Sequence, residues 1–135
     1  MTKYLHTMIR VTDPEATIRF FELIGLREMR RVSSEQGRFT LIFLAAPDQE
    51  GVAEVELTYN WPAEDGSYEK YTGGRNFGHL AFEVENIYET CQRLMDAGVT
   101  IIRGCDVDNG DATVCRGDRN AFGDWHLLCN GWRQG

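Results

Sequence analysis

The chain contains two similar segments, and this internal repeat limits the possible folds more than any other feature of the sequence. In the first segment a strand-like run around His6 is followed, 19 positions later, by Gly25. In the second, His79 and Gly98 stand at the same separation of 19 positions. Because each segment alone would have a marginal core, we expect the two to share one core.

The first segment predicts a strand, a helix and three further strands, in that order. Apolar and polar residues alternate over Tyr4–Val11, which indicates a half-buried strand. Asp13 and Pro14 form an N-cap and a first helical position, and Gly25 is a typical helix stop. Three strands are then expected, at Leu26–Ser33, Arg38–Ala45 and Val52–Tyr59.

The second segment predicts the same order of elements. Gly78–Val84 has the pattern of a strand, Asn86 and Glu89 resemble a capping box, and Gly98 would end the helix. Three strands are expected at Thr100–Arg103, Ala112–Arg116 and Trp125–Cys129, with an acidic loop at Asp106–Asp111. We therefore predict an α+β fold of two βαβββ modules.

Length and composition fit one domain of residues 1–135. The first module would span about 1–61, a polar linker about 62–76 and the second module about 77–135. No apolar run approaches the roughly 18 residues of a membrane span, and the N-terminus lacks the apolar region of a signal peptide. No cysteine pair has C-x-x-C spacing, so reduced thiols in a cytoplasmic protein are expected.

The charge of the chain argues against polyanionic partners. There are 21 acidic and 14 basic residues, for a formal net charge of -7, and the Lys and Arg residues form no cluster. Nucleic acids and anionic membranes prefer basic patches, so neither is an expected partner. A small anionic ligand needs only a few local arginines and is still compatible with this charge.

Polar residues recur on one face of three predicted strands. His6 and Arg10 share a face of the first strand, Glu56 lies on the polar face of another, and His79 occupies the position equivalent to His6. Two imidazoles and a carboxylate suit Zn, Ni, Co, Mn or Fe. From spacing alone, a metal site and a solvated sheet face are about equally compatible with this pattern.

Three segments resemble the glyoxalase I (lactoylglutathione lyase) family of the vicinal-oxygen-chelate superfamily. They are Leu5–Val11, Val55–Trp61 and Arg75–Ala81. The resemblance implies that the paired modules form an open β cup around one divalent metal, with Ni or Zn expected and Co or Mn as alternatives. It also implies a homodimer that isomerises the hemithioacetal of methylglyoxal and glutathione to S-lactoylglutathione, a detoxification reaction.

The resemblance also implies roles for individual residues. Three of the four metal ligands are expected at His6, Glu56 and His79, and Glu56 is also expected to move the proton. Contacts with the glutathione part of the substrate are expected at Arg10, Asn60 and Arg75, since arginines pair with carboxylates and an amide bonds peptide groups.

The sequence departs from the family at the fourth metal ligand. Aligned on Gly123, the family's glutamate position is Leu127, and the neighbouring His126 is expected on the other face of a regular strand. Three interpretations follow. The chain is a working glyoxalase I with a three-residue site completed by water or His126, a related metalloprotein with another substrate, or a non-catalytic binding protein of the bleomycin-resistance type.

Overall fold

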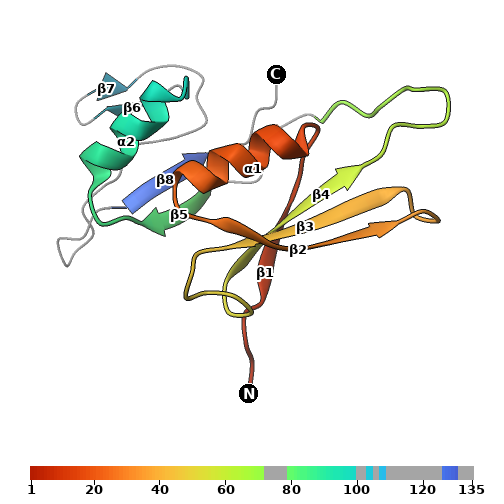
Figure 1. Cartoon of the computed structure of the whole chain (residues 1–135), viewed down its shortest axis with the longest axis horizontal. Coiled ribbons are helices and arrows are strands. Elements are labelled where there is room, and N and C mark those ends of the chain that lie inside the picture. The colour runs from red at the N-terminus through yellow and green to blue at the C-terminus, as the bar shows by residue number, and fades with distance from the viewer. Residues whose placement is uncertain (72–78, 100–102, 105–106, 109–125, 131–135) are drawn as a thin grey trace. The chain divides into compact units, whose positions relative to one another are not determined.

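The computed structural model describes residues 1–71, 79–99, 103–104, 107–108 and 126–130 (Figure 1). The chain divides into two compact units, Met1–Lys70 and Tyr71–Arg133. Each unit has the element order strand, helix, strand, strand, strand. The order in the first unit agrees with the βαβββ pattern that the sequence predicts, whereas in the second unit the agreement covers only the strand and helix at its start and the strand at its end. Within the described residues, no helix is long and apolar enough to cross a membrane.

The first unit is a four-stranded sheet with one helix. Its elements are β1 (His6–Arg10), α1 (Pro14–Leu23), β2 (Arg27–Ser34), β3 (Phe39–Ala45) and β4 (Glu54–Asn60). The strand order is β1-β4-β3-β2, with β1 parallel to β4 and the other neighbours antiparallel. Because β1 and β4 are neighbours, residues about 50 positions apart in the sequence lie side by side.

Local sequence signals set both ends of α1. The Asp13 Oδ1 accepts the Ala16 N–H at 3.0 Å, and Pro14 occupies the first turn. At the other end Gly25 has φ 102°, a conformation that residues with a Cβ rarely adopt. The N-cap and the stop predicted for this helix are confirmed.

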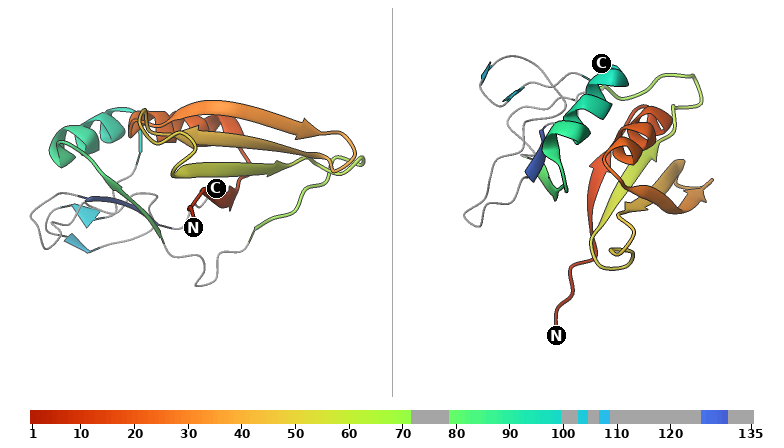
Figure 2. Two further views of the ribbon diagram at one scale, coloured as in Figure 1. Left: turned by 90° about the horizontal axis from the view of Figure 1, so that it is seen from below. Right: turned by 60° about the vertical axis from the view of Figure 1, so that its left-hand side comes forward.

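The core of this unit lies between α1 and one face of the sheet (Figures 1 and 2). The middle residues of β3 and β4 that point to this face are almost fully buried, and they meet the buried apolar side of the helix. Buried apolar residues on this side include Val11, Ile18, Phe20, Phe21, Ile42, Leu44, Val55 and Leu57. Burying each large side chain contributes roughly 1.5–3 kcal/mol, which favours this face of the sheet as the one that packs on the helix. Because side chains alternate along a strand, the residues between the buried ones lie on the opposite face.

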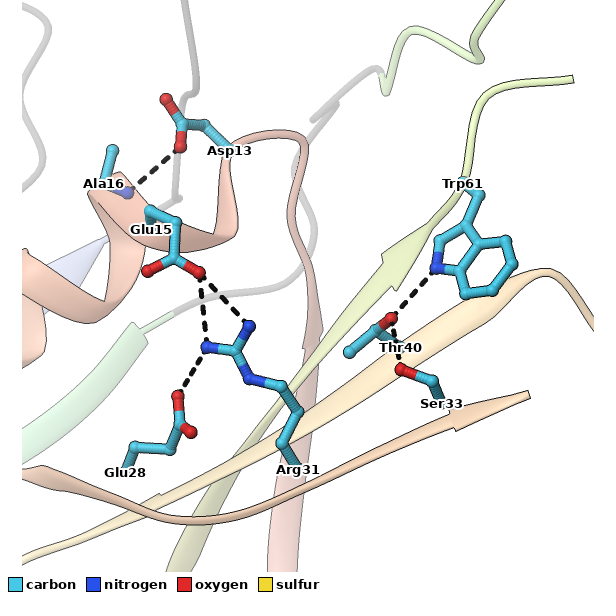
Figure 3. A network of polar contacts seen from close by, with 8 residues as sticks. All are labelled: Asp13, Glu15, Ala16, Glu28, Arg31, Ser33, Thr40 and Trp61. Atoms are coloured by element: carbon cyan, nitrogen blue, oxygen red, sulfur yellow. Dashed lines mark hydrogen bonds and ion pairs between the residues drawn. The ribbon is translucent and has the colours of Figure 1, made fainter. Parts of the chain in front are cut away.

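A polar network reinforces the contact between helix and sheet (Figure 3). The Arg31 guanidinium of β2 donates to Glu15 of α1 at 3.2 Å and to Glu28 at 2.6 Å. Farther along the sheet, the Trp61 Nε1–H donates to the Thr40 Oγ1 at 2.9 Å. The Arg31 contacts hold the helix on one side of the sheet, and the Trp61–Thr40 bond links β3 to the residue that follows β4.

The predicted strand boundaries are correct to within two residues in this unit. The largest differences are at the starts of β1 and β4, which begin at His6 and Glu54 instead of Tyr4 and Val52. At β4 the cause is visible in the backbone. The N–H groups of Val52 and Ala53 both donate to the carbonyl oxygen of Gln49, so these residues belong to the preceding turn. Backbone bonding in the turn therefore delays the start of the strand.

The second unit contains β5 (His79–Glu83), α2 (Ile87–Asp96), β6 (Arg103–Gly104), β7 (Val107–Asp108) and β8 (His126–Asn130). The Asn86 side chain caps α2 by accepting the N–H groups of Tyr88 and Glu89, and Gly98 has φ 86°. The cap and stop predicted for this helix are thus confirmed.

Strand pairing in the second unit differs from that in the first. β5 and β8 are antiparallel, whereas β1 and β4 are parallel, so the repeat extends to element order but not to this pairing. The short strand β7 pairs with β6 and falls inside the predicted loop Asp106–Asp111, a prediction that was wrong at those two residues. The strand predicted at Ala112–Arg116 lies outside the described residues, as does most of the one at Thr100–Arg103.

Candidate functional site

The candidate site residues of the first unit share the face of the sheet that α1 does not cover. In the parallel register, His6 pairs with Glu54, Met8 with Glu56 and Arg10 with Thr58. The intervening residues of β4, Val55 and Leu57, are buried on the helix side. Since side chains alternate along a strand, the polar residues of β1 and β4 are collected on one face, as the sequence predicts.

His6 and Glu56 are the two predicted metal ligands in this unit. The His6 ring is exposed and meets the Phe43 ring edge-on, with centroids 5.6 Å apart and planes at 80°. Glu56 is half-buried. Within the described part of the chain, neither the imidazole nitrogens nor the Glu56 carboxylate makes a hydrogen bond. Both groups therefore have electron pairs to offer to a ligand.

Glu54 lies beside these two residues but is already paired. Its carboxylate accepts hydrogen bonds from both terminal nitrogens of Arg30, at 2.7 and 2.9 Å, and from the Gly51 N–H at 3.0 Å. The bonds from Arg30 lower the pKa of Glu54 to about 2, against the opposing effect of burial. The same pairing raises the pKa of Arg30. Glu54 is thus a buried carboxylate held ionised.

The sequence does not reveal this ion pair. Glu54 is two residues before Glu56, so alternation along the strand puts it on the same face. Arg30, however, stands 24 residues earlier in β2, and β3 lies between β2 and β4 in the sheet. Only the strand order brings the two charges together. The sequence does show arginines in the predicted strand Leu26–Ser33, which suggests an ion pair on this strand. It does not show which carboxylate would be the partner.

Arg10 and Asn60 contact one another, as expected for two residues proposed to bind the same part of a ligand. The Arg10 Nε–H donates to the Asn60 Oδ1 at 3.3 Å, and both side chains are exposed. The remaining N–H groups of the guanidinium are donors suited to a carboxylate. This pair lies toward the ends of β1 and β4, away from His6 by the length of the strand.

The other predicted site residues belong to the second unit. His79 is the first residue of β5 and pairs in register with Asn130, whereas Arg75 lies outside the described residues. In the same register Glu83 pairs with His126 and Phe82 with Leu127. Paired positions lie on the same face of a two-stranded sheet, so position 126 shares a face with position 83. Positions 79 and 83 are four residues apart on β5 and also share a face, so position 126 lies on the face of position 79. The family alignment places the fourth ligand at position 127 instead.

The described residues supply part of a metal site. They contain no group of three or more His, Cys, Asp or Glu side chains close enough together to hold an ion. The first unit nevertheless presents an imidazole at His6 and a carboxylate at Glu56 on one face, and this donor set fits a divalent transition metal. A complete site would need further ligands, for which His79 is the predicted candidate.

Comparisons with known proteins agree in pointing to one family. The family model described as Glyoxalase/Bleomycin resistance protein/Dioxygenase superfamily matches residues 3–123. The lactoylglutathione lyase of Haemophilus influenzae is 38% identical over 111 residues, which cover 82% of this chain and 78% of that protein. The lactoylglutathione lyase of Neisseria meningitidis serogroup A is 36% identical over 102 residues, covering 75% of this chain and 70% of that protein.

Solved structures support the same fold. The trypanothione-dependent glyoxalase I of Leishmania major matches 93% of this chain and 84% of its own, with a TM-score of 0.62 and 28% identity. The glyoxalase I of Zea mays matches 96% of this chain and 45% of its own, with a TM-score of 0.58 and 19% identity. The second likeness bears on the fold alone, because its sequence identity is low.

Proposed function

The chain belongs to the Glyoxalase/Bleomycin resistance protein/Dioxygenase superfamily, and on that basis we propose that it is a metal-dependent lactoylglutathione lyase. The substrate would be the hemithioacetal of methylglyoxal and glutathione, and the product S-lactoylglutathione. The observation that carries the proposal is the pair His6 and Glu56, which share one sheet face and make no hydrogen bond within the described residues. Relatives at 36–38% identity bear the same enzyme name.

The proton transfer is assigned to Glu56. Its carboxylate is half-buried and unbonded within the described residues, so its oxygens are available as a base. It would take the proton from the carbon that bears sulfur and return it to the adjacent carbon, while the hydroxyl proton passes from the oxygen of the first carbon to the oxygen of the second. When held by His6, Glu56 and His79, a divalent metal such as Ni or Zn supplies Lewis-acid polarisation of the substrate oxygens.

Substrate binding is assigned to Arg10, Asn60 and Arg75. The Arg10 guanidinium and the Asn60 amide are already in contact at 3.3 Å, which forms one polar patch with donors and an acceptor. A carboxylate of glutathione would bind the arginines, and a peptide group would bind the amide. These contacts would hold the thiol conjugate while Glu56 acts on its reacting carbons.

We also propose that the active enzyme is a homodimer in which the ligands of one site come from two copies. The proposal rests on the family, since glyoxalase I proteins are typically dimeric. In this chain His6 and Glu56 belong to one compact unit and His79 to the other.

Formation of S-lactoylglutathione tests the proposed function. Metal-free protein and protein loaded with Ni or Zn are supplied with the hemithioacetal, and the thioester is followed by its ultraviolet absorbance. We expect a rate above background with metal and none without it. A folded protein that gives no rate with any of Ni, Zn, Co or Mn would rule out this function.

Leu127 favours a second candidate function. A leucine at the family's glutamate position can neither bind a metal nor accept a proton. The alternative is a metalloprotein of the same superfamily that acts on another substrate, or a protein that only binds a small molecule. Elemental analysis separates these two, because the first retains a divalent metal after purification and the second does not.

A further inference from the structure

Two carboxylates compete for the same histidine on the open face of the first sheet. Glu54 is the register partner of His6 across the parallel strands β1 and β4. Glu56 lies two residues farther along β4, on the same face. Both are of the chemical type that binds a divalent metal together with an imidazole. By position alone, Glu54 is the nearer partner in register.

Arg30 removes Glu54 from this competition. Its two terminal nitrogens donate to the two carboxylate oxygens of Glu54, at 2.7 and 2.9 Å, and the Gly51 N–H donates to Oε2 at 3.0 Å. The Glu54 side chain is only 3% exposed. The guanidinium matches the charge of the carboxylate, and the three hydrogen bonds occupy three of its roughly four lone-pair sites. Glu56 has no such partner among the described residues.

Phe43 connects Arg30 to His6. The Arg30 guanidinium lies over the Phe43 ring, 4.0 Å from its centroid, and the same ring meets the His6 ring edge-on. The three side chains come from β2, β3 and β1, and in register Phe43 is the partner of both Arg30 and Glu56. The ion pair and the histidine therefore form one packed group.

We propose that Arg30 is a positioning residue that determines which carboxylate binds the metal: it holds Glu54 in a two-point ion pair and so leaves Glu56 as the partner of His6. The inference rests on the proposed function in one respect, since it requires a metal at His6. Beyond the proposed function, the inference gives Arg30, Glu54 and Phe43 a role in selecting Glu56 as the metal-binding carboxylate, the same group that is proposed to move the proton.

Nickel affinity of the metal-free full-length protein, measured by titration calorimetry, tests this role. In the wild-type background we expect Glu56→Gln to weaken Ni²⁺ binding at least about tenfold, and Glu54→Gln to change it by less than about threefold. In the Arg30→Met background we expect the dependence on Glu56 to fall, so that Glu56→Gln weakens Ni²⁺ binding by less than about threefold, because the released Glu54 carboxylate takes its place. An effect of Glu56→Gln that is the same in both backgrounds would overturn the proposal.

Two further variants guard against loss of folding, because Arg30→Met leaves Glu54 buried without its cation. Arg30→Met/Glu54→Gln removes both charges, and we expect it to bind Ni²⁺ like the wild type and to need Glu56 as before. A loss of affinity of more than about tenfold in this variant would contradict the proposal. Arg31→Met is the matched control, since Arg31 pairs with Glu15 and Glu28 on the other face. It should leave Ni²⁺ affinity unchanged.

The outcomes distinguish this inference from the proposed function. A wild type that binds no Ni²⁺ and forms no product refutes both. A wild type that binds Ni²⁺ through Glu56, and that depends on Glu56 to the same extent when Arg30 is replaced, refutes only the role of Arg30.

Discussion

Replacing Glu54 with glutamine should destabilise the metal-free protein at neutral pH and have less effect in acid. The Arg30 guanidinium lowers the pKa of Glu54 from 4.5 to about 2 in the folded chain. One pKa unit corresponds to about 1.4 kcal/mol, so the pairing stabilises the fold by at most about 3 kcal/mol. Arg30 is 48% exposed and therefore partly screened by solvent, which brings our expected value closer to 2 kcal/mol.

The direction of the pH dependence follows from the lowered pKa. A carboxylate that is more acidic in the folded state contributes its full stabilisation above pH 4.5, and loses it as the pH falls through about 2. Urea unfolding of the wild type and Glu54→Gln at pH 7 and pH 3 measures the difference. We expect the gap between them to narrow at pH 3. A gap of equal size at both pH values would refute the reasoning, and Glu56→Gln serves as the control without an ion pair.

Three other predictions concern the assembly, the missing ligand and the helix cap. Mixing inactive His6→Ala and His79→Ala proteins should restore about a quarter of wild-type activity if each site takes ligands from two copies, and none if it does not. Glutamate introduced at Leu127 or at His126 should raise kcat roughly 10²–10⁴-fold at whichever position is the fourth ligand, and leave kcat unchanged at the other. No rise at either would show that the missing base does not limit turnover. Asp13→Ala should lower the free energy of unfolding by about 1 kcal/mol in urea, through loss of the cap on Ala16; an unchanged midpoint would contradict this.

The parts of the fold that depend on neighbouring residues could be predicted from the sequence. Asp13, Pro14 and Gly25 act within one or two turns of α1, so their effect does not depend on the rest of the chain. The alternation along β4 likewise separates Val55 and Leu57 from the polar face before any partner strand is known.

The parts that depend on strand order could not be predicted. Arg30 lies on β2 and Glu54 on β4, and β3 runs between them in the sheet. The two side chains meet because both lie on the same face of this sheet and reach across β3. Similarly, equivalent positions of His6 and His79 in the repeat do not determine pairing, since β1–β4 is parallel and β5–β8 is antiparallel. The individual residues of the candidate site could therefore be identified from the sequence. The ion pair with Arg30, which occupies the Glu54 carboxylate, could not.

The central claim is that Glu56 moves the proton on a metal-bearing face shared with His6. The most direct test compares S-lactoylglutathione formation by the wild type and Glu56→Gln, both at saturating Ni²⁺ with bound nickel confirmed by elemental analysis. Loss of a general base typically costs about 10²–10⁴-fold, and we predict a fall in kcat of that size. A Glu56→Gln protein that binds nickel and turns over at the wild-type rate would contradict the assignment.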